Sequence, residues 1–172
     1  ADIKILDLCC GTGVLGITAA LELPGSKVTL VDNSDEAVCL AELNVRYLEV
    51  EDQVEIVQRD VLSNYPESWM GKFDYILANP PYIPMHKIAD LSMEVQREPH
   101  YALTDGSNGQ SFYRYWGVNL NFLLKSDGMF FCEIDNYIAE YIHKLLGDGF
   151  VDLLITRDLG DVQRVCEATL EN

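Results

Sequence analysis

The sequence Phe73-Asp74-Tyr75-Ile76-Leu77-Ala78-Asn79-Pro80-Pro81-Tyr82 joins a short apolar run to two consecutive prolines. The run Phe73–Ala78 has the apolar content of a buried strand. Proline lacks a backbone N–H and disfavours helical geometry in the residue before it, so the chain must leave the sheet after Ala78 in an extended form. The stretch therefore predicts a central strand that ends in a rigid tetrapeptide.

This rigidity gives Asn79–Tyr82 a chemical use. Because the prolines restrict the backbone, we expect the Asn79 side-chain oxygen and the Pro80 carbonyl to be two fixed acceptors aimed at one point. The planar NH2 group of a carboxamide or an amino-purine offers two donors of matching geometry, and Tyr82 offers an aromatic wall. We predict Asn79, Pro80, Pro81 and Tyr82 to be catalytic. The alternative is a proline-rich turn in which Tyr82 fills the core.

Strand and helix patterns alternate on both sides of this stretch. Such alternation with short connections predicts an α/β fold with a parallel, doubly wound sheet. The last two strands have no helix between them, which predicts one antiparallel hairpin strand. Asn33 is predicted to be the N-cap of the second helix, and Gly128 is predicted to end the turn after the third. The predicted strands span residues 3–8, 27–31, 54–58, 73–78, 129–134, 150–156 and 164–170, and the predicted helices span residues 12–23, 33–48, 111–124 and 136–146.

Length and composition indicate one globular domain covering residues 1–172, with 48% hydrophobic residues. No apolar run is long enough to cross a bilayer, and none has the features of a signal peptide. The chain starts inside its first predicted strand without a Met, so we expect a fragment of a longer protein.

The cysteines form no CxxC pair and no metal-ligand spacing with the histidines, which predicts reduced thiols, a cytoplasmic protein and no metal site. They are Cys9, Cys10, Cys39, Cys132 and Cys166.

The formal charge is −16, from 28 acidic and 12 basic residues. A surface that binds duplex DNA or RNA normally carries a basic stripe. The basic residues of this chain are scattered singly along the sequence. The charge therefore argues against nucleic acid as the main substrate and is compatible with a basic protein partner.

A glycine-containing loop, Asp7–Gly16, lies between the first predicted strand and the first predicted helix. Gly11 and Gly13 allow positive φ angles and a close approach of backbone to a ligand, and the helix N-terminus behind them favours a negative group. The spacing G-x-G-x-x-G occurs here once and is a weak signal by itself. The alternative is that the glycines serve turn geometry only. We predict cofactor contacts from Asp7, Cys9, Cys10, Gly11, Thr12 and Gly13.

Further candidates for cofactor binding follow the second and third predicted strands. Asp32 fits the acidic residue that accepts hydrogen bonds from ribose hydroxyls, with Asn33 after it. Asp60 is placed for an adenine amino group, with Val61 beside the ring. Ligands of open α/β sheets bind at the carboxyl ends of the strands, where Asn79 also lies, so we predict that Asn33 and Asn79 contact the cofactor as well. Alternatively, Asp32 is a turn residue and Asp60 a cap.

Two cofactors fit this arrangement, an NAD-like dinucleotide and S-adenosylmethionine. A dinucleotide needs a binding site for its pyrophosphate, and hydride transfer gives Asn79–Tyr82 no role. Beside a methyl donor these residues have a role, because they can orient an amide next to the methyl group. Together Asp7–Gly16, Asp32, Asp60 and Asn79–Tyr82 resemble class I S-adenosylmethionine-dependent methyltransferases that act on amide or exocyclic amino nitrogens. The resemblance implies a Rossmann-like, seven-stranded sheet of order 3-2-1-4-5-7-6 with strand 7 antiparallel, which agrees with the predicted hairpin.

The later part of the chain resembles the release-factor glutamine methyltransferases of the HemK/PrmC family. The resemblance implies N5-methylation of the glutamine in a Gly-Gly-Gln motif of a peptide chain release factor, with Asn79 and Pro80 accepting its two N–H bonds. Cys9 and Asp105 stand where the family usually has glycine, and we expect no counterpart of the family's helical N-terminal domain within residues 1–172. The matching segments are residues 94–95, 98–103, 105–109, 113–114, 128–134, 157–160 and 164–165.

Two other functions remain open at this point. An adenine or guanine amino methyltransferase acting on DNA or RNA would share the pocket but would need a basic surface. A non-catalytic adapter with the same fold would be favoured by a lost glycine loop or an altered Asn79, and both are intact. Glu94 and Glu98 are interpreted as structural or groove-lining residues rather than as a catalytic carboxylate pair.

Overall fold

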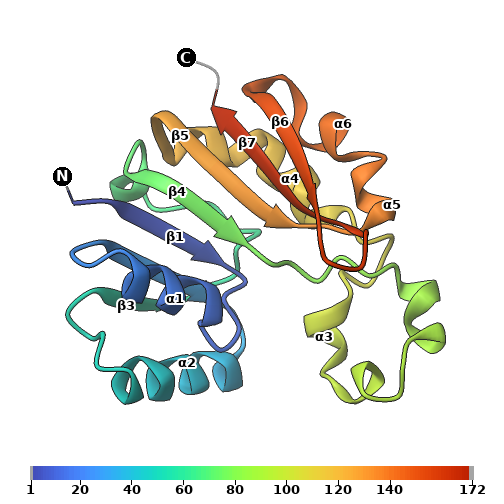
Figure 1. Ribbon diagram of the computed structural model, residues 1–172, viewed down its shortest axis with the longest axis horizontal. Coiled ribbons are helices and arrows are strands. Elements are labelled where there is room, and N and C mark those ends of the chain that lie inside the picture. The colour runs from blue at the N-terminus through green and yellow to red at the C-terminus, as the bar shows by residue number, and fades with distance from the viewer. Residues whose placement is uncertain (1, 171–172) are drawn as a thin grey trace.

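The computed structural model describes residues 2–170, apart from the side chain at position 148. Its seven strands form one sheet in the order β3-β2-β1-β4-β5-β7-β6 (Figure 1). β7 is antiparallel to both of its neighbours, and the other pairs are parallel. The predicted α/β fold and strand order are thereby confirmed. The strands are β1 (Lys4–Leu8), β2 (Lys27–Asp32), β3 (Val54–Gln58), β4 (Phe73–Ala78), β5 (Leu124–Glu133), β6 (Phe150–Arg157) and β7 (Gln163–Leu170).

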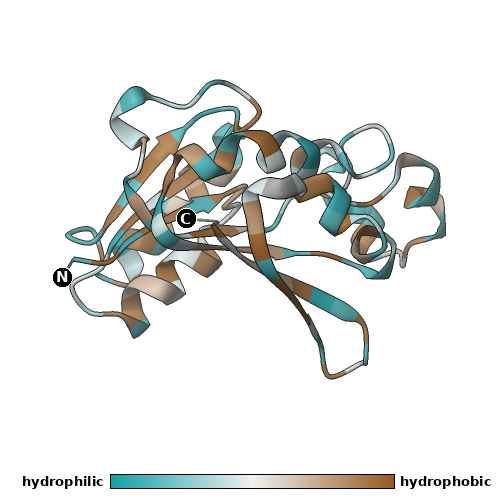
Figure 2. Ribbon diagram, turned by 90° about the horizontal axis from the view of Figure 1, so that it is seen from above, coloured by the Kyte–Doolittle hydropathy of each residue, from teal (hydrophilic) through white to brown (hydrophobic). Residues whose placement is uncertain are grey.

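Helices cover both faces of the sheet because both faces are apolar. Successive strand residues point to opposite faces, so Ile5 belongs to one buried cluster while Leu6 and Leu8 belong to another. Figure 2 shows apolar segments along the strands and the β6–β7 hairpin extending beyond the rest of the sheet. The first cluster includes side chains of α1 (Val14–Glu22) and α2 (Asp35–Tyr47), and the second includes side chains of α4 (Ser111–Asn119), α5 (Asn136–Ala139) and α6 (Ile142–Leu146).

The segment between β4 and α4 forms a small lobe beside the carboxyl ends of the strands (Figure 1). Backbone hydrogen bonds fold it on itself, from Ile83 N to the Leu103 carbonyl and from Met85 N to the Ser107 carbonyl, both 2.9 Å. The lobe therefore lies where a ligand of this fold is expected. Its short helices are η2 (Met85–Asp90), η3 (Val95–Arg97) and α3 (His100–Leu103), and the other 3-10 turns of the chain are η1 (Glu67–Trp69), η4 (Leu120–Phe122) and η5 (Gly147–Gly149).

The prediction that Asn33 caps the second helix is wrong. The N-cap is Ser34, whose hydroxyl accepts the Ala37 N–H at 3.2 Å, and the helix begins at Asp35. The physical reason is the Asp32 carboxylate, which accepts the Ser34 N–H at 3.0 Å and holds the chain in a turn before the helix begins. Asn33 is thereby left at the edge of the cavity described below.

Three boundaries in the second half of the chain also differ from the prediction. The third helix ends at Asn119 because the chain tightens there into η4, and β5 already begins at Leu124. Gly128 lies within β5, in a bulge between the pairs Phe73–Leu124 and Tyr75–Met129. The predicted helix 136–146 is two helices, since the Tyr141 N–H donates to the carbonyl only three residues back and breaks the α-helical pattern.

The five cysteines are free thiols. Cys10, Cys132 and Cys166 are buried, Cys9 is half-buried and Cys39 is exposed. Within residues 2–170, no helix combines the length and the apolar character that a membrane span needs.

Candidate active site

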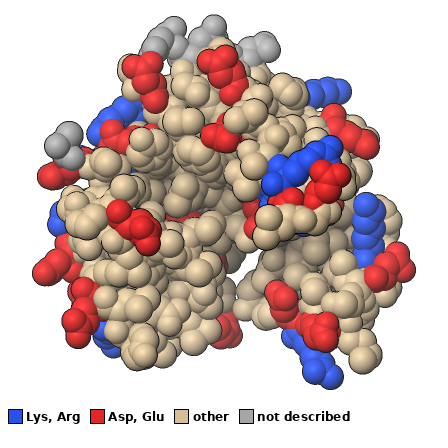
Figure 3. All heavy atoms as spheres, in the orientation of Figure 1, with Lys and Arg blue, Asp and Glu red and all other residues tan. Residues whose placement is uncertain are grey.

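A cavity of about 350 Å³ opens at the carboxyl ends of the first four strands. Its size is within the usual range for small-molecule sites. Figure 3 shows the surface hollowed between the side of α1 and α2 and the lobe that contains α3. The lining comes from the loop after β1, the ends of β2, β3 and β4, the lobe and the start of α4. The lining residues predicted from the sequence are Cys9, Cys10, Gly11, Thr12, Asp32, Asn33, Asp60, Val61, Asn79 and Pro81.

Four of the predicted site residues lie outside this lining, namely Asp7, Gly13, Pro80 and Tyr82. Asp7 is fully buried, and its Oδ2 accepts the Gly16 N–H at 2.8 Å, which fixes the loop to the start of α1. Gly13 has φ 83°, and a Cβ there would come within 2.9 Å of the Ile17 and Leu30 side chains. These two residues are placed to shape the loop, and direct contact with a ligand stays a prediction.

The loop after β1 has positive φ angles at Cys9 and Gly11. Gly11 has φ 55°, with open space where a Cβ would point, and its N–H donates to Asp32 Oδ2 at 2.9 Å. Cys9 has φ 57°, a left-handed conformation that costs a non-glycine residue about 1–2 kcal/mol. This positive φ angle explains why the release-factor glutamine methyltransferases usually have glycine at this position. The present chain has a cysteine side chain there instead.

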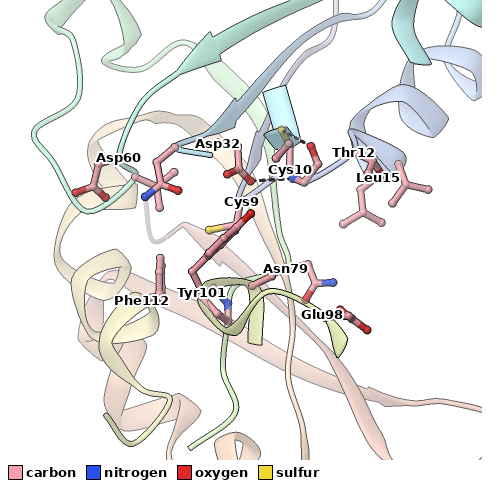
Figure 4. A pocket seen from close by; sticks show the side chains of 17 residues that line it. Cys9, Cys10, Thr12, Leu15, Asp32, Asp60, Asn79, Glu98, Tyr101 and Phe112 are labelled. Atoms are coloured by element: carbon pink, nitrogen blue, oxygen red, sulfur yellow. Dashed lines mark hydrogen bonds between the residues drawn. The ribbon is translucent and has the colours of Figure 1, made fainter. Parts of the chain in front are cut away.

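The electrostatics of the cavity select among ligands. Its lining includes three carboxylates, Asp32, Asp60 and Glu98, and none of the described lining residues is Lys or Arg. Figure 4 shows Asp60 and Glu98 at opposite ends of the cavity. Such a lining repels the diphosphate of a dinucleotide and attracts a cationic ligand. The residues present thus fit the sulfonium of S-adenosylmethionine better than an NAD-like cofactor.

Asn79 is one of the residues that line this cavity. It is exposed, whereas Pro80 and Pro81 are buried and hold the backbone in place. Among residues 2–170, no group hydrogen-bonds to the Asn79 amide. An unpaired carboxamide beside a cavity is available to orient a polar group of a ligand.

Several lining residues were not singled out as site residues from the sequence, among them Tyr101 and Phe112. Figure 4 shows Tyr101 at the cavity. Its hydroxyl lies 3.2 Å from Ser34 Oγ, so it bridges the lobe and the N-cap of α2. Phe112, at the start of α4, faces the cavity near Asp60 in the same view. Tyr101 belongs to no periodic pattern, and the fold of the lobe brings it to the strand ends. Phe112 lies within the helix predicted from the sequence, but that pattern does not show that its ring faces the cavity.

A family model for the methyltransferase small domain matches residues 1–107. The chain belongs to this family. It is therefore a methyltransferase domain of the S-adenosylmethionine-dependent class.

Curated relatives and solved structures extend this likeness along the chain. A release factor glutamine methyltransferase of Chlorobaculum tepidum is 35% identical over 163 residues, covering 94% of this chain and 55% of the relative. A ribosomal protein uL3 glutamine methyltransferase of Burkholderia pseudomallei is 32% identical over 171 residues, covering 91% of this chain and 56% of the relative. The structure of magnesium protoporphyrin IX methyltransferase from Synechocystis PCC 6803 with bound S-adenosylmethionine has a TM-score of 0.63, with 18% identity over 99% of this chain and 71% of that one. The chain spans about half the length of the curated relatives it matches.

The buried carboxyl group of this methyltransferase domain predicts a pH dependence of stability. The pKa of Asp7 is raised from 3.8 to about 7, mainly by burial. The hydrogen bond from the Gly16 N–H opposes this shift, and the charge of Asp32 adds to it. Between these values the folded state binds more protons than the unfolded state, so the unfolding free energy falls as pH rises, by at most about 4 kcal/mol. The Asp7→Asn variant has no titrating group at this position, so its unfolding free energy does not undergo this fall. Urea unfolding between pH 4 and pH 7 should therefore show the variant gaining stability relative to the wild type as pH rises.

The exposed Asp52→Asn is the control for this measurement, because its carboxyl group lies in solvent. Its unfolding free energy relative to the wild type should stay constant over the same pH range. A constant difference for Asp7→Asn as well would mean that Asp7 has the same pKa in the folded and unfolded states, which would contradict the raised pKa.

Proposed function

We propose that this domain transfers the methyl group of S-adenosylmethionine to the side-chain nitrogen of a protein glutamine, in the Gly-Gly-Gln motif of a peptide chain release factor. The observation that carries the proposal is the unpaired Asn79 amide held by two buried prolines at an acidic cavity. The names of the curated relatives support glutamine as the acceptor. The proposal treats residues 1–172 as one catalytic domain that works in the cytoplasm, where release factors act.

The cofactor would be held by residues at the ends of β2 and β3. Asp32, fixed by the Gly11 and Ser34 N–H groups, has lone pairs left to accept ribose hydroxyls. Asp60 is available to an adenine amino group, with Val61 beside the ring. When bound, S-adenosylmethionine supplies an electrophilic methyl group on a cationic sulfur, and a structural neighbour binds the same molecule.

The residues of the chain then act on the glutamine amide. Its nitrogen is a poor nucleophile because its lone pair is delocalised. The Asn79 side-chain oxygen and the Pro80 carbonyl accept hydrogen bonds from its two N–H groups. They thereby orient the nitrogen toward the methyl carbon. Positive charge grows on this nitrogen as its new bond to carbon forms, so both hydrogen bonds strengthen in the transition state. One N–H proton leaves afterwards, and no base is needed before the transfer.

A single assay tests the proposal against its competitors. The domain is incubated with methyl-labelled S-adenosylmethionine and, separately, a release factor, ribosomal protein uL3 and an RNA pool. We expect label in the release factor, on the glutamine of Gly-Gly-Gln by peptide mass measurement, and no label when this glutamine is replaced by glutamate. Labelling of uL3 alone would replace the proposed substrate. Labelling of RNA alone, or of none of the three, would refute the proposal.

The charge of the surface supports a protein substrate. Acidic side chains are spread over the face in Figure 3, and basic ones occur singly among them. With a formal charge of −16, the domain repels a polyanion and attracts a basic protein surface.

A further inference from the structure

A cluster of polar side chains outside the cavity holds the last residue of the Asn79–Tyr82 motif. The Tyr82 hydroxyl donates to Glu133 Oε1 at 2.7 Å and accepts from Arg164 Nη1 at 3.1 Å. Arg164 lies 3.7 Å from the same Glu133 oxygen, and its Nε donates to Asp158 Oδ2 at 3.1 Å. We call Glu133, Arg164 and Asp158 the tyrosine clamp. It joins the end of β5, the start of β7 and the turn before β7 to the motif.

The backbone at Tyr82 is held as well. A Cβ at Gly109 would lie 1.9 Å from the Tyr82 carbonyl oxygen, so the chain at position 109 packs directly against it. The next residue, Ile83, donates its N–H to the Leu103 carbonyl at 2.9 Å. Tyr82 is therefore fixed both at its hydroxyl and at its main chain.

The position of Tyr82 determines the position of Asn79. The two residues are separated only by Pro80 and Pro81, whose φ angles are locked and whose preceding residues are restricted. On its other side, Asn79 follows Ala78, which is paired with β1 and β5. A rigid connector anchored at both ends leaves Asn79 little freedom, and releasing one anchor would shift its side chain.

We propose that Glu133 and Arg164 are positioning residues for methyl transfer, acting through the Tyr82 hydroxyl on the aim of Asn79. This inference rests on the proposed function, because it assigns Asn79 the orienting role. The hydrogen bond from Tyr82 to the carboxylate is charge-assisted, which makes it shorter and stronger than a neutral one. Arg164 is held by Asp158 and balances the charge of Glu133. Burial and the charge of Glu133 both raise the pKa of Tyr82, so its hydroxyl remains a donor.

The test is a double-mutant cycle with Glu133→Ala and Tyr82→Phe. Each variant should lose about 10-fold in kcat, by analogy with residues that orient a ligand, at unchanged KM for S-adenosylmethionine. Because both changes release the same anchor, the double variant should be no slower than the slower single variant. Glu133→Gln, which keeps an acceptor for the hydroxyl, should lose less than Glu133→Ala. Multiplied losses in the double variant would overturn the proposal, as would an equal loss of cofactor binding.

Arg157→Ala is the matched control, since Arg157 sits on the same hairpin and pairs with Asp161 instead. It should keep the wild-type kcat. A second readout needs no substrate: the side-chain amide signal of Asn79 in NMR spectra, assigned by its loss in Asn79→Ala. This signal should shift in Glu133→Ala and stay in place in Arg157→Ala, whatever the methyl acceptor is. An unmoved signal would refute the positioning role even if glutamine methylation is confirmed, and a shifted signal would uphold it if another acceptor is found.

Discussion

Replacing Asn79 by alanine is expected to lower kcat by about 100- to 1,000-fold, the usual cost of removing one preorganised hydrogen-bonding group from a transition state. The affinity for S-adenosylmethionine should change by about twofold at most, as for substitutions that remove no strong contact. The expected split follows from the structure, because the Asn79 amide has no partner within residues 2–170 and is free to bind the acceptor. Steady-state kinetics and calorimetric titration measure the two quantities.

Two further variants make this result specific. Asn79→Gln keeps the carboxamide but moves it by one methylene, and a displacement of about 1 Å can itself cost about 100-fold. Asn119→Ala removes an amide that bonds to the Tyr115 carbonyl on α4 and should leave kcat unchanged. If Asn79→Ala lost cofactor affinity and turnover to the same extent, Asn79 would be a cofactor ligand and not an orienting residue.

Much of the fold could be predicted because its determinants are local and periodic. Apolar runs such as Phe73–Ala78 mark the strands, and the missing helix before residues 164–170 marks the hairpin. Helix boundaries were less accessible, since they depend on contacts between distant residues. The start of α2 is set by the Asp32 carboxylate bonding to the Ser34 N–H, and the end of α4 by a 3-10 turn that leads into a bulged strand.

The site divides in the same way. Residues at the ends of successive parallel strands, such as Asp32, Asp60 and Asn79, were predictable because the topology brings those ends to one edge. Tyr101 reaches the cavity only through the fold of an irregular lobe. The tyrosine clamp joins Tyr82 to residues 51 and 82 positions away, and no spacing rule connects them.

Asp32 is the residue whose replacement should weaken cofactor binding most. Its carboxylate accepts the Gly11 and Ser34 N–H groups at 2.9 and 3.0 Å, so it fixes the glycine loop against the start of α2. It is also the predicted acceptor for the ribose hydroxyls. Hydrogen bonds to charged groups contribute about 1.5–3 kcal/mol each, so Asp32→Ala should raise the Kd for S-adenosylmethionine by about 100-fold.

Asp32→Asn separates the two parts of this loss. The amide keeps one acceptor oxygen but turns its NH2 toward one of the two backbone N–H groups, which leaves that donor unpaired. We therefore expect its Kd, measured by calorimetry, to fall between those of the wild type and Asp32→Ala, with Asp52→Asn equal to the wild type. Saturating cofactor should restore most of the kcat in both Asp32 variants, because Asn79 and its prolines lie on another strand end. A kcat that stays low at saturation would instead place Asp32 in the transfer step, and an unchanged Kd would remove it from the cofactor site.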